Sequence, residues 1–354
     1  MNQTTYNHLK ELIEDSGLTR SKTTHLKPIQ IIDFSNETIL ITGAAGSIGS
    51  ELAKQLLACK YKKLILIDIA ESPLYNVIKA FENENLTNVS FLLINIKEED
   101  ELKHLFETHK PTIVFHAAAY KHVPLMEVHP YEAVKTNIIA TKSLADLAIK
   151  HEVKKFIFIS TDKAVNPISV MGMSKRIAEN QLLQLAKTSN TLFSIARFGN
   201  IIGSNGSVLP IFIKQIESGL PLTLTSPTVT RYFIGKHKAC SLILQLATFN
   251  KMESHVFTFN MGKPIKLKDL ADCLIDFYPN ETVEIKITGL RLGEKNEESM
   301  IANDEFLVPT RNDAIFLVKE KLENKYNNLD LTNLINITPY ISPQEIKNTL
   351  LTYI

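Results

Sequence analysis

The segment STDKAVNPISVMGMSK brings together side chains that can exchange protons. Asp162 and Lys163 are adjacent, so a carboxyl group and an amine can act as a coupled acid–base pair. Thr161 stands before them and offers a hydroxyl group to a substrate oxygen. Met171 and Lys175 are four residues apart and share a face if this part of the chain is helical. Thr161, Asp162 and Lys163 are therefore candidate catalytic residues beside a helix that carries Met171 and Lys175, although the run TDK taken alone could equally belong to a solvated loop.

A glycine-rich turn earlier in the chain predicts a phosphate-binding site. The turn TGAAGSIG follows an apolar run and precedes the helix-like segment SELAKQLL. Gly43 and Gly46 let the backbone pass close to a pyrophosphate, and Gly49 lets the helix pack on the strand. The N-terminus of the helix supplies free N–H donors. We therefore expect dinucleotide binding by Gly43, Ala45, Gly46, Ser47, Ile48 and Gly49.

The ends of later apolar runs are expected to complete the cofactor site. About twenty residues beyond Gly49, Asp68 is placed to accept hydrogen bonds from an adenosine ribose. This carboxylate would repel a 2′-phosphate, and no arginine follows it in DIAESPLY, so NAD is favoured over NADP. The other expected contacts are Asn95 and Ile96 near the adenine, and Ala117, Ala118 and Ala119 near the nicotinamide. The three alanines could instead form only a tight strand-to-helix turn.

Apolar runs that alternate with helix-length segments predict the fold. TILITG, KLILID, VSFLLIN, TIVFHAAA, KKFIFIS and TLFSIARFG lack polar alternation, which suits strands buried on both faces of a parallel sheet. The predicted class is α/β, a Rossmann-type doubly wound parallel sheet with a smaller C-terminal substrate-binding portion. The predicted division is a polar, partly helical arm outside the core at 1–36, an NAD-binding Rossmann domain at 37–200 and a substrate-binding portion at 201–354, which can return segments to the Rossmann core. Helices are expected in the last part at 236–248, 267–277 and 343–351.

The composition excludes several classes of protein. The chain has 354 residues, 44% of them hydrophobic and 22% charged, with a formal charge of +1. Basic residues are spread out, which gives no reason to expect a nucleic acid partner. Cys59, Cys240 and Cys273 lie far apart, so we expect buried thiols, a reducing compartment and no metal site. The N-terminus is too polar for a signal peptide and no apolar run is long enough to span a bilayer, so a cytoplasmic protein without a membrane partner is expected.

The spacing of the glycines is similar to that of short-chain dehydrogenase/reductases. In that family the helix after the fifth strand carries Tyr-x-x-x-Lys, in which tyrosinate takes the substrate hydroxyl proton and lysine binds the nicotinamide ribose. Lys175 matches the lysine, whereas Met171 stands in place of the tyrosine and can transfer no proton. The resemblance implies that Lys175 contacts the cofactor, and it disfavours a simple alcohol dehydrogenase.

Longer motifs resemble one branch of that family. They are TGAAGSIGSELAKQLL, HAAAYKHVPLMEVHPYEAVKTN, STDKAVNPISVMGMSKR, RFGNIIGSNGSVLPIF, TRYF and ITGLRLGEK. Together they resemble the nucleotide-sugar 4,6-dehydratases of bacterial polysaccharide biosynthesis that act on UDP-N-acetylglucosamine. Relatives with methionine in the tyrosine position look like the configuration-retaining type. Many of those carry an N-terminal membrane region, and we expect this chain to be a free-standing soluble catalytic unit.

The resemblance implies a reaction and a role for each residue. Hydride passes from C4 of the sugar to NAD+, and the resulting 4-ketone makes the C5 proton acidic. Lys163 removes that proton, Asp162 protonates the departing C6 hydroxyl, and the hydride returns to C6. Thr161 binds the C4 oxygen and relays its proton to Asp162 or water. A neighbouring ammonium favours ionised Asp162, whereas a general acid needs the protonated form. Because NAD is regenerated within each turnover, it should stay tightly bound.

Substrate contacts are expected from both halves of the chain. The expected residues are Lys121, His122, Asn200, Ser204, Asn205, Gly206, Ser207, Arg231 and Arg291. By resemblance Lys121 and His122 line the sugar pocket and Glu127 faces the same cleft, although a lone histidine is more often structural. The polar loop and the two arginines suit a diphosphate, with a surface ion pair as the alternative for each arginine. The acidic run after Arg291 is interrupted by Asn296, a departure from the family pattern.

Other functions stay open from the sequence. A nucleotide-sugar epimerase also uses a transient 4-keto sugar and tightly held NAD, but epimerisation at C4 needs no base at C5, so Asp162 and Lys163 favour elimination. A non-catalytic NAD-sensing scaffold would be expected to lose Lys163 or Lys175, and both are present. The substrate is expected to be a UDP-sugar, with a GDP-sugar as the alternative, and the chain is expected to form a homo-oligomer.

Overall fold

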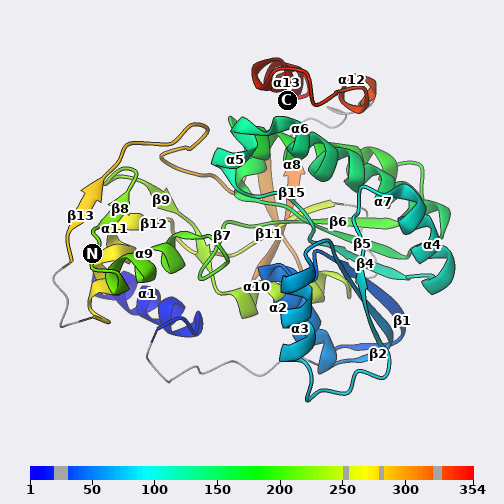
Figure 1. The fold of residues 1–354 in the computed structure, drawn as a ribbon, viewed down its shortest axis with the longest axis horizontal. Coiled ribbons are helices and arrows are strands. Elements are labelled where there is room, and N and C mark those ends of the chain that lie inside the picture. Colours follow the sequence, from blue (N-terminus) through cyan, green and yellow to red (C-terminus); the bar gives the residue numbers. More distant parts are fainter. Residues whose placement is uncertain (20–30, 250–254, 279–282, 322–328) are drawn as a thin grey trace.

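The structure is a computed structural model that describes residues 1–19, 31–249, 255–278, 283–321 and 329–354. It has two lobes (Figure 1): a large one built on a nine-stranded sheet and a small one on the side of the N-terminus. Residues 20–30 of the predicted N-terminal arm lie outside the described residues.

The predicted strands form most of the large sheet. Its strands in spatial order are β14 (Glu305–Pro309), β15 (Ile315–Glu320), β11 (His255–Phe259), β6 (Leu192–Arg197), β5 (Lys155–Ile159), β4 (Ile113–His116), β1 (Asp33–Thr42), β2 (Lys60–Asp68) and β3 (Val89–Leu93). Neighbouring strands from β3 to β11 are parallel. Strand β15 is antiparallel to β11, and β14 is antiparallel to β15. The chain order reverses between β1 and β4, so the carboxyl ends of these strands open a crevice. The predicted doubly wound α/β fold is confirmed.

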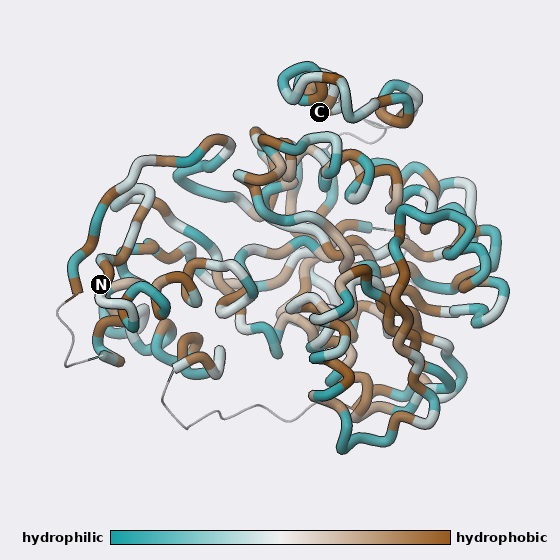
Figure 2. Tube along the Cα trace, in the orientation of Figure 1, coloured by the Kyte–Doolittle hydropathy of each residue, from teal (hydrophilic) through white to brown (hydrophobic). Residues whose placement is uncertain are grey.

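Helices cover both faces of this sheet (Figure 1). One face carries α2 (Ser47–Leu57), α3 (Glu71–Ala80) and α10 (Lys236–Leu246), and the other carries α4 (Glu99–His109), α7 (Ala140–Lys150) and α8 (Val170–Ala186). The strands between the helices are largely hydrophobic (Figure 2). Leu40 of β1 and Phe156 of β5 are 0% exposed. Because both faces are covered, the strands can be apolar throughout.

The segment after residue 200 contributes to both lobes. Helix α10 packs on α2, where the Gln55 side chain donates to the His237 carbonyl at 2.9 Å. Strands β11, β15 and β14 extend the large sheet beyond β6. The helices expected in this segment appear as α10, α11 (Leu267–Ile275) and α13 (Pro343–Leu351). The predicted substrate-binding portion thus also supplies strands to the large sheet, because β11 finds its hydrogen-bonding partner on β6.

The small lobe has a hydrophobic core of its own. It contains α1 (Gln3–Asp15), α9 (Val208–Glu217), α11 and three strand pairs, β8 (Leu222–Leu224) with β13 (Ile285–Ile287), β9 (Thr230–Arg231) with β12 (Ile265–Lys266), and β7 (Asn200–Ile201) with β10 (Phe233–Ile234). The prediction of an arm outside the core is wrong for α1. Leu9, Leu12 and Ile13 are buried in this core, since they form an apolar stripe at helical spacing that the polar average of the segment hides. Strand β1 also begins at Asp33, before the predicted end of the arm.

Short helices cover the edge of the large lobe next to α8. They are α5 (Val123–Val128), α6 (Pro130–Ala133), a π-helical turn (Val134–Ile139) and α12 (Thr332–Ile335), packed with α13. Leu334, Ile346 and Leu350 of the C-terminal segment are buried against this group. All three cysteines are buried, as predicted. Among the described residues, no helix combines the length and the apolar character needed to cross a membrane.

Candidate active site

One large cavity, of about 640 Å³, lies at the carboxyl ends of the parallel strands and extends to the small lobe. It brings together most residues that the sequence marks for chemistry. The predicted residues that line it are Gly43, Gly46, Ser47, Ile48, Gly49, Ala117, Ala119, Lys121, His122, Thr161, Lys163, Met171, Lys175, Asn200, Ser204, Asn205, Gly206, Ser207, Arg231 and Arg291. Five predicted cofactor residues, Ala45, Asp68, Asn95, Ile96 and Ala118, and the predicted catalytic residue Asp162 are not in that lining.

The glycine turn is packed so closely that larger residues do not fit. Gly43 has φ of +68°, and a Cβ there would lie 2.6 Å from the Ala118 nitrogen. A Cβ on Gly49 would lie 2.1 Å from the Gly43 carbonyl oxygen. Gly46 caps α2 without a side-chain hydrogen bond, so the N–H groups of the first turn remain available to an anion. This is the arrangement that a pyrophosphate group needs.

Asp68 ends β2 as predicted, and its carboxylate holds the glycine turn in place. Its carboxylate accepts hydrogen bonds from the Ala45 and Ala70 amides, both at 2.9 Å. It is 9% exposed. The contact with an adenosine ribose stays a prediction, as do the contacts expected of Asn95 and Ile96 at the end of β3.

A buried polar chain behind the turn was not predicted from the sequence. The His116 ring lies 2.7 Å from the Thr42 hydroxyl through Nδ1 and 2.9 Å from the Thr141 hydroxyl through Nε2. Burial and, to a smaller extent, the charge of Lys175 lower the pKa of His116 to about 3. A neutral imidazole therefore joins the ends of β1 and β4 to α7. In the sequence His116 ends an apolar run, and no neighbouring residue indicates that its ring meets two hydroxyl groups.

The turn after β5 holds the predicted proton-transfer residues. Lys163 donates from Nζ to Asp162 Oδ1 at 2.9 Å and to Asn200 Oδ1 at 3.2 Å. The Thr161 hydroxyl donates to the same Asp162 oxygen at 2.9 Å. A Cβ on Gly172 would lie 2.3 Å from the Lys163 carbonyl oxygen, so the turn rests directly on α8. Lys163 and Thr161 thus reach the cavity from a rigid support.

The placement of Asp162 does not fit its predicted role as the acid that protonates the leaving hydroxyl. The residue is 0% exposed, and its Oδ1 already accepts from Thr161 and Lys163. Asp162 begins a 3-10 turn (Asp162–Ala164) and is not part of the lining of the cavity. Asp162 therefore orients Lys163 and Thr161 from behind the cavity wall.

Helix α8 presents Met171 and Lys175 to the cavity, one turn apart as predicted. The Lys175 ammonium lies 3.7 Å from the centre of the Phe158 ring. Burial lowers the pKa of Lys175 to about 7, against an opposing effect of the Glu179 carboxylate. Met171 is 4% exposed and forms an apolar part of the wall. No group at position 171 can accept a proton.

Two sets of contacts that the sequence does not reveal hold α8 in place. Arg197 of β6 pairs with Glu179 at 2.7 Å and with Glu305 of β14 at 2.8 Å, all three being buried. At the N-terminus of α8, Glu127 accepts a hydrogen bond from the Val170 amide at 2.7 Å. The prediction that Glu127 faces the cleft is therefore wrong, because its carboxylate caps the helix and pairs with Lys347 of α13 at 2.7 Å.

The polar loop before α9 meets the glycine turn across the cavity. The Asn205 amide donates to the Ser47 hydroxyl at 3.0 Å. Ser207 caps α9, and its buried hydroxyl oxygen has no hydrogen-bond partner among the described residues. A Cβ on Gly206 would lie 2.6 Å from the His122 ring, so the histidine closes against this loop. Burial and the charges of Lys121 and Arg291 lower the pKa of His122.

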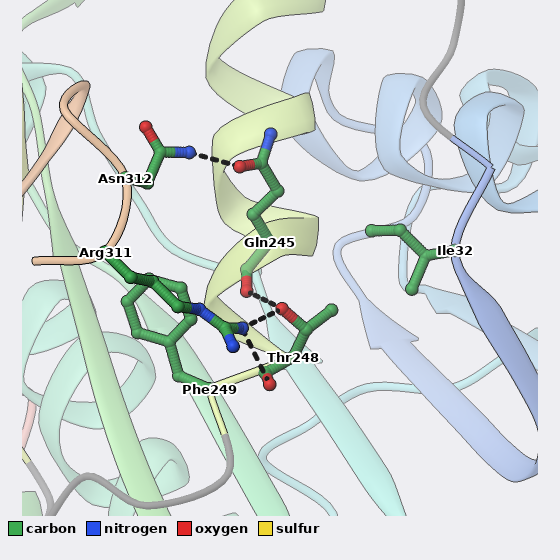
Figure 3. A pocket seen from close by; sticks show the side chains of 6 residues that line it. All are labelled: Ile32, Gln245, Thr248, Phe249, Arg311 and Asn312. Carbon is green, nitrogen blue, oxygen red and sulfur yellow. Dashed lines mark hydrogen bonds between the residues drawn. The ribbon is translucent and has the colours of Figure 1, made fainter.

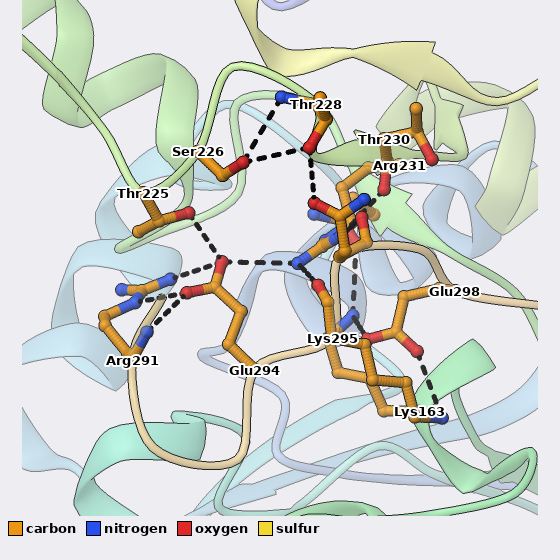
Figure 4. A network of polar contacts seen from close by, with 12 residues as sticks. Lys163, Thr225, Ser226, Thr228, Thr230, Arg231, Arg291, Glu294, Lys295 and Glu298 are labelled. Atoms are coloured by element: carbon orange, nitrogen blue, oxygen red, sulfur yellow. Dashed lines mark hydrogen bonds and ion pairs between the residues drawn. The ribbon is translucent and has the colours of Figure 1, made fainter. Parts of the chain in front are cut away.

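The loop after β13 is held by the two predicted arginines in different ways (Figure 4). Arg231 is 4% exposed and donates to the carbonyls of Asn296 at 3.1 Å and Lys295 at 2.8 Å, and it pairs with Glu294 at 3.2 Å. Arg231 therefore holds the loop from inside the protein. It forms neither a surface ion pair nor a direct contact site for a phosphate. Arg291 is exposed at the mouth of the cavity and pairs with Glu294 at 3.1 Å. Of the two arginines, Arg291 is thus the one whose side chain is open to solvent at the cavity.

A second, smaller hollow of about 410 Å³ lies beside the end of α10 (Figure 3). The Arg311 guanidinium lies 4.5 Å from the centre of the Phe249 ring and donates to the Thr248 hydroxyl at 2.7 Å. Asn312 donates to Gln245. These polar groups are used within the chain, and the hollow shows no acid–base pair.

The fold and the glycine turn at the end of β1 define a Rossmann-type protein of the short-chain dehydrogenase/reductase class. The same fold is found in the X-ray structure of Pen from Bacillus thuringiensis, which is 29% identical, with a TM-score of 0.75 over 90% of this chain and 98% of that one. The chain belongs to the polysaccharide biosynthesis protein family, whose model matches residues 39–320.

Two kinds of protein occur among the relatives that are similar to this chain in sequence. The probable polysaccharide biosynthesis protein EpsC of Bacillus subtilis is 43% identical over 77% of this chain, which spans only 46% of EpsC. The UDP-glucose 4-epimerase of Rickettsia rickettsii is 32% identical over 77% of this chain and 80% of that protein. The chain thus spans about half the length of the first relative, at 46%, and most of the second, at 80%.

Proposed function

We propose that this chain is an NAD-dependent UDP-N-acetylglucosamine 4,6-dehydratase that retains the configuration at C5. The observation that carries the proposal is the amine of Lys163, which enters the cavity and is oriented by Asp162 and Asn200. Loss of water requires a base that removes the C5 proton, whereas epimerisation at C4 does not. The family, with its polysaccharide biosynthesis members, supports the same assignment.

The residues present fit NAD. When bound, NAD+ would accept the hydride from C4 of the sugar, and its reduced form would donate that hydride to C6. Gly43, Gly46 and Gly49 leave the backbone open to its pyrophosphate at the N-terminus of α2. Lys175 would donate to the nicotinamide ribose. Asp68, whose oxygens keep lone pairs beside their two backbone bonds, would accept from the adenosine ribose.

The small lobe fits the diphosphate of a nucleotide sugar. The N-terminus of α9 opens on the cavity, and at that end of the helix lies the hydroxyl of Ser207, which has no hydrogen-bond partner in the described part of the chain. Arg291 can add a charge-assisted contact at the mouth of the cavity. The Asn205 amide is hydrogen-bonded to the Ser47 hydroxyl. The pyrophosphate of NAD at α2 and the diphosphate of the nucleotide sugar at α9 would therefore lie on opposite sides of this hydrogen bond.

The turn after β5 handles two protons in this mechanism. A C4 hydroxyl bound to Thr161 can pass its proton along the existing hydrogen bond to Asp162. Lys163 takes the C5 proton, and the same ammonium, whose protons exchange with solvent, later delivers a proton to C5 from the same side, which retains the configuration. Met171 provides an apolar wall at the position from which a tyrosine would otherwise act.

A nucleotide-sugar 4-epimerase is the second candidate, because relatives with that name are 32% identical to this chain. It uses the same cofactor chemistry at C4. The two activities differ in the mass of the product, since elimination removes one water and epimerisation removes nothing.

Incubation with UDP-N-acetylglucosamine in heavy water tests the proposal. We expect a product lighter by one water, with deuterium at C5 and the xylo configuration, read by mass spectrometry and NMR. Lys163→Ala should abolish turnover and leave NAD bound, while Lys150→Ala, an exposed change on α7, should leave both unaltered. A product of unchanged mass from the unaltered protein would refute the dehydratase, and full activity of Lys163→Ala would refute the base.

A further inference from the structure

The C-terminal helix α13 lies over the helix that carries Met171. It packs on α6 and α8 (Figure 1), and its Ile346 and Leu350 are buried in the same hydrophobic cluster as Met171. Residues 329–354 follow the part of the chain that the family model matches, residues 39–320. The apolar wall of the cavity at Met171 is therefore continuous with the packing of a segment outside that match.

Glu127 connects α13 to the first turn of α8. Its side chain is 2% exposed. Its Oε1 accepts a hydrogen bond from the Val170 amide at 2.7 Å, and its Oε2 accepts one from Lys347 Nζ at 2.7 Å. Val170 is the first residue of α8, so no carbonyl within the helix can accept from its amide. The carboxylate thus caps the helix one residue before Met171.

The same carboxylate also supports the loop after β13. Gly293 of that loop has φ of +76°, and a Cβ there would lie 2.8 Å from Glu127 Oε1 and 3.0 Å from the Ser169 Cβ. The backbone of the loop therefore rests directly on the start of α8. Arg291, which lines the cavity, is two residues away in this loop. A displacement of Glu127 would thus move both the wall at Met171 and the loop that carries Arg291.

The charge of Glu127 makes this arrangement depend on Lys347. The Lys347 side chain is 22% exposed and comes from a helix far from Glu127 in sequence. A buried carboxylate that loses its cationic partner is strongly unfavourable, because water does not replace the lost interaction. Without Lys347, the carboxylate gains by turning toward solvent, and that movement removes the acceptor of the Val170 amide.

We propose that Lys347 is a positioning residue for the active site. Through Glu127 it fixes the first turn of α8, with Met171, and the loop that carries Arg291. As far as it concerns turnover, this inference rests on the proposed dehydratase function. Neither Lys347 nor Glu127 is part of the cavity lining, so Lys347 acts on the reaction through its partner and not by touching substrate.

The variant Lys347→Met tests this role. NAD-loaded protein is assayed for kcat and KM with UDP-N-acetylglucosamine, and for the Kd of UDP by calorimetry. We expect kcat to fall by about 10-fold or more, since a misplacement of about 1 Å can cost about 100-fold. KM and the Kd of UDP should both rise several-fold, because the loop with Arg291 loses its support. A variant that is only less well folded loses kcat in proportion to its folded fraction and keeps its KM.

Three further variants test the pairing of charges. Lys347→Arg keeps a positive charge and should retain the unaltered values. Glu127→Gln keeps a carbonyl oxygen for the Val170 amide and needs no cation, so the double variant Glu127→Gln with Lys347→Met should recover most of the loss seen in Lys347→Met alone. Gln344→Met, an exposed change one turn earlier on α13, should behave as the unaltered protein.

The outcomes separate the positioning role from the dehydratase function. Unchanged kcat, KM and Kd in Lys347→Met would overturn the role. So would a loss of kcat alone, a double variant as impaired as Lys347→Met, or a Lys347→Arg variant without activity, because the effect would then come from folding or from packing of the lysine stem. If the unaltered protein binds UDP but releases no water, the dehydratase function fails, and the Kd of UDP still decides the role of Lys347. An unaltered protein that binds no UDP would overturn both.

Discussion

Lys175 offers a test of whether a residue that binds the cofactor lowers the stability of the nucleotide-free protein. Its ammonium is buried over the Phe158 ring, and among the described residues no hydrogen bond reaches it. We expect Lys175→Met to make the nucleotide-free protein more stable and to weaken NAD binding. Methionine has a similar length, so it removes the charge without leaving a large cavity. The reasoning is that the buried amine destabilises the empty site and is stabilised only by the ribose hydroxyls of bound NAD.

The magnitude follows from the lowered pKa. A fall from 10.5 to about 7 corresponds to about 5 kcal/mol of destabilisation when Lys175 is protonated in the folded state, at about 1.4 kcal/mol per pKa unit. Because the folded pKa lies below the unfolded one, the unfolded chain binds more protons between these values, and stability rises with pH from about 7 to about 10.5. Between pH 6 and pH 9 this group alone should add about 3 kcal/mol to the free energy of unfolding of the nucleotide-free protein.

Urea denaturation of the nucleotide-free proteins at pH 6 and pH 9 measures this effect. The unaltered protein should gain about 3 kcal/mol more than Lys175→Met over that interval. Lys150→Met, the same change at an exposed position of α7, should keep the pH dependence of the unaltered protein. Equal pH dependence in the unaltered protein and Lys175→Met would show that the amine is hydrated or paired, and would refute the reasoning.

Two further predictions concern the loops around the cavity. Gly49→Ala should cost about 1–3 kcal/mol and abolish NAD binding, because its Cβ would lie 2.1 Å from the Gly43 carbonyl oxygen; Gly235→Ala, with no atom within 4 Å, should be close to neutral in the same denaturation and NAD titration. Arg231→Met should lower the free energy of unfolding by about 3–5 kcal/mol, because it breaks a buried pair with Glu294, and a loss below about 1 kcal/mol in urea denaturation would contradict the structural role.

The features that could be predicted depend on short spacing along the chain. Gly43 and Gly49 act within one turn, and Met171 and Lys175 within one helical turn, so local geometry decides where they point. The parallel topology then brings the turn after β5 to the same edge of the sheet as the glycine turn. For this reason a single sequence sufficed for the fold and for the position of Lys163.

The features that were missed depend on contacts between distant segments. Glu298 meets Lys163, and Lys347 meets Glu127, only after the chain has folded. An acidic run gives no indication of which carboxylate turns inward. The predicted role of Asp162 failed for a different reason, since its neighbours Thr161 and Lys163 line the cavity while Asp162 itself is buried.

The same contacts explain how a site with methionine at position 171 can still manage protons. Lys163 of the large lobe meets Glu298 of the loop after β13 at 3.9 Å, so their separation must be fixed by something other than a shared helix. Lys295 supplies such a link, because it donates to the Val165 carbonyl two residues after Lys163 and lies in the same loop as Glu298. Arg231 holds that loop from inside through the Asn296 and Lys295 carbonyls. A helix with tyrosine fixes its acid–base group by itself, whereas here the geometry of the reaction depends on how firmly one loop of the small lobe is held against the turn after β5.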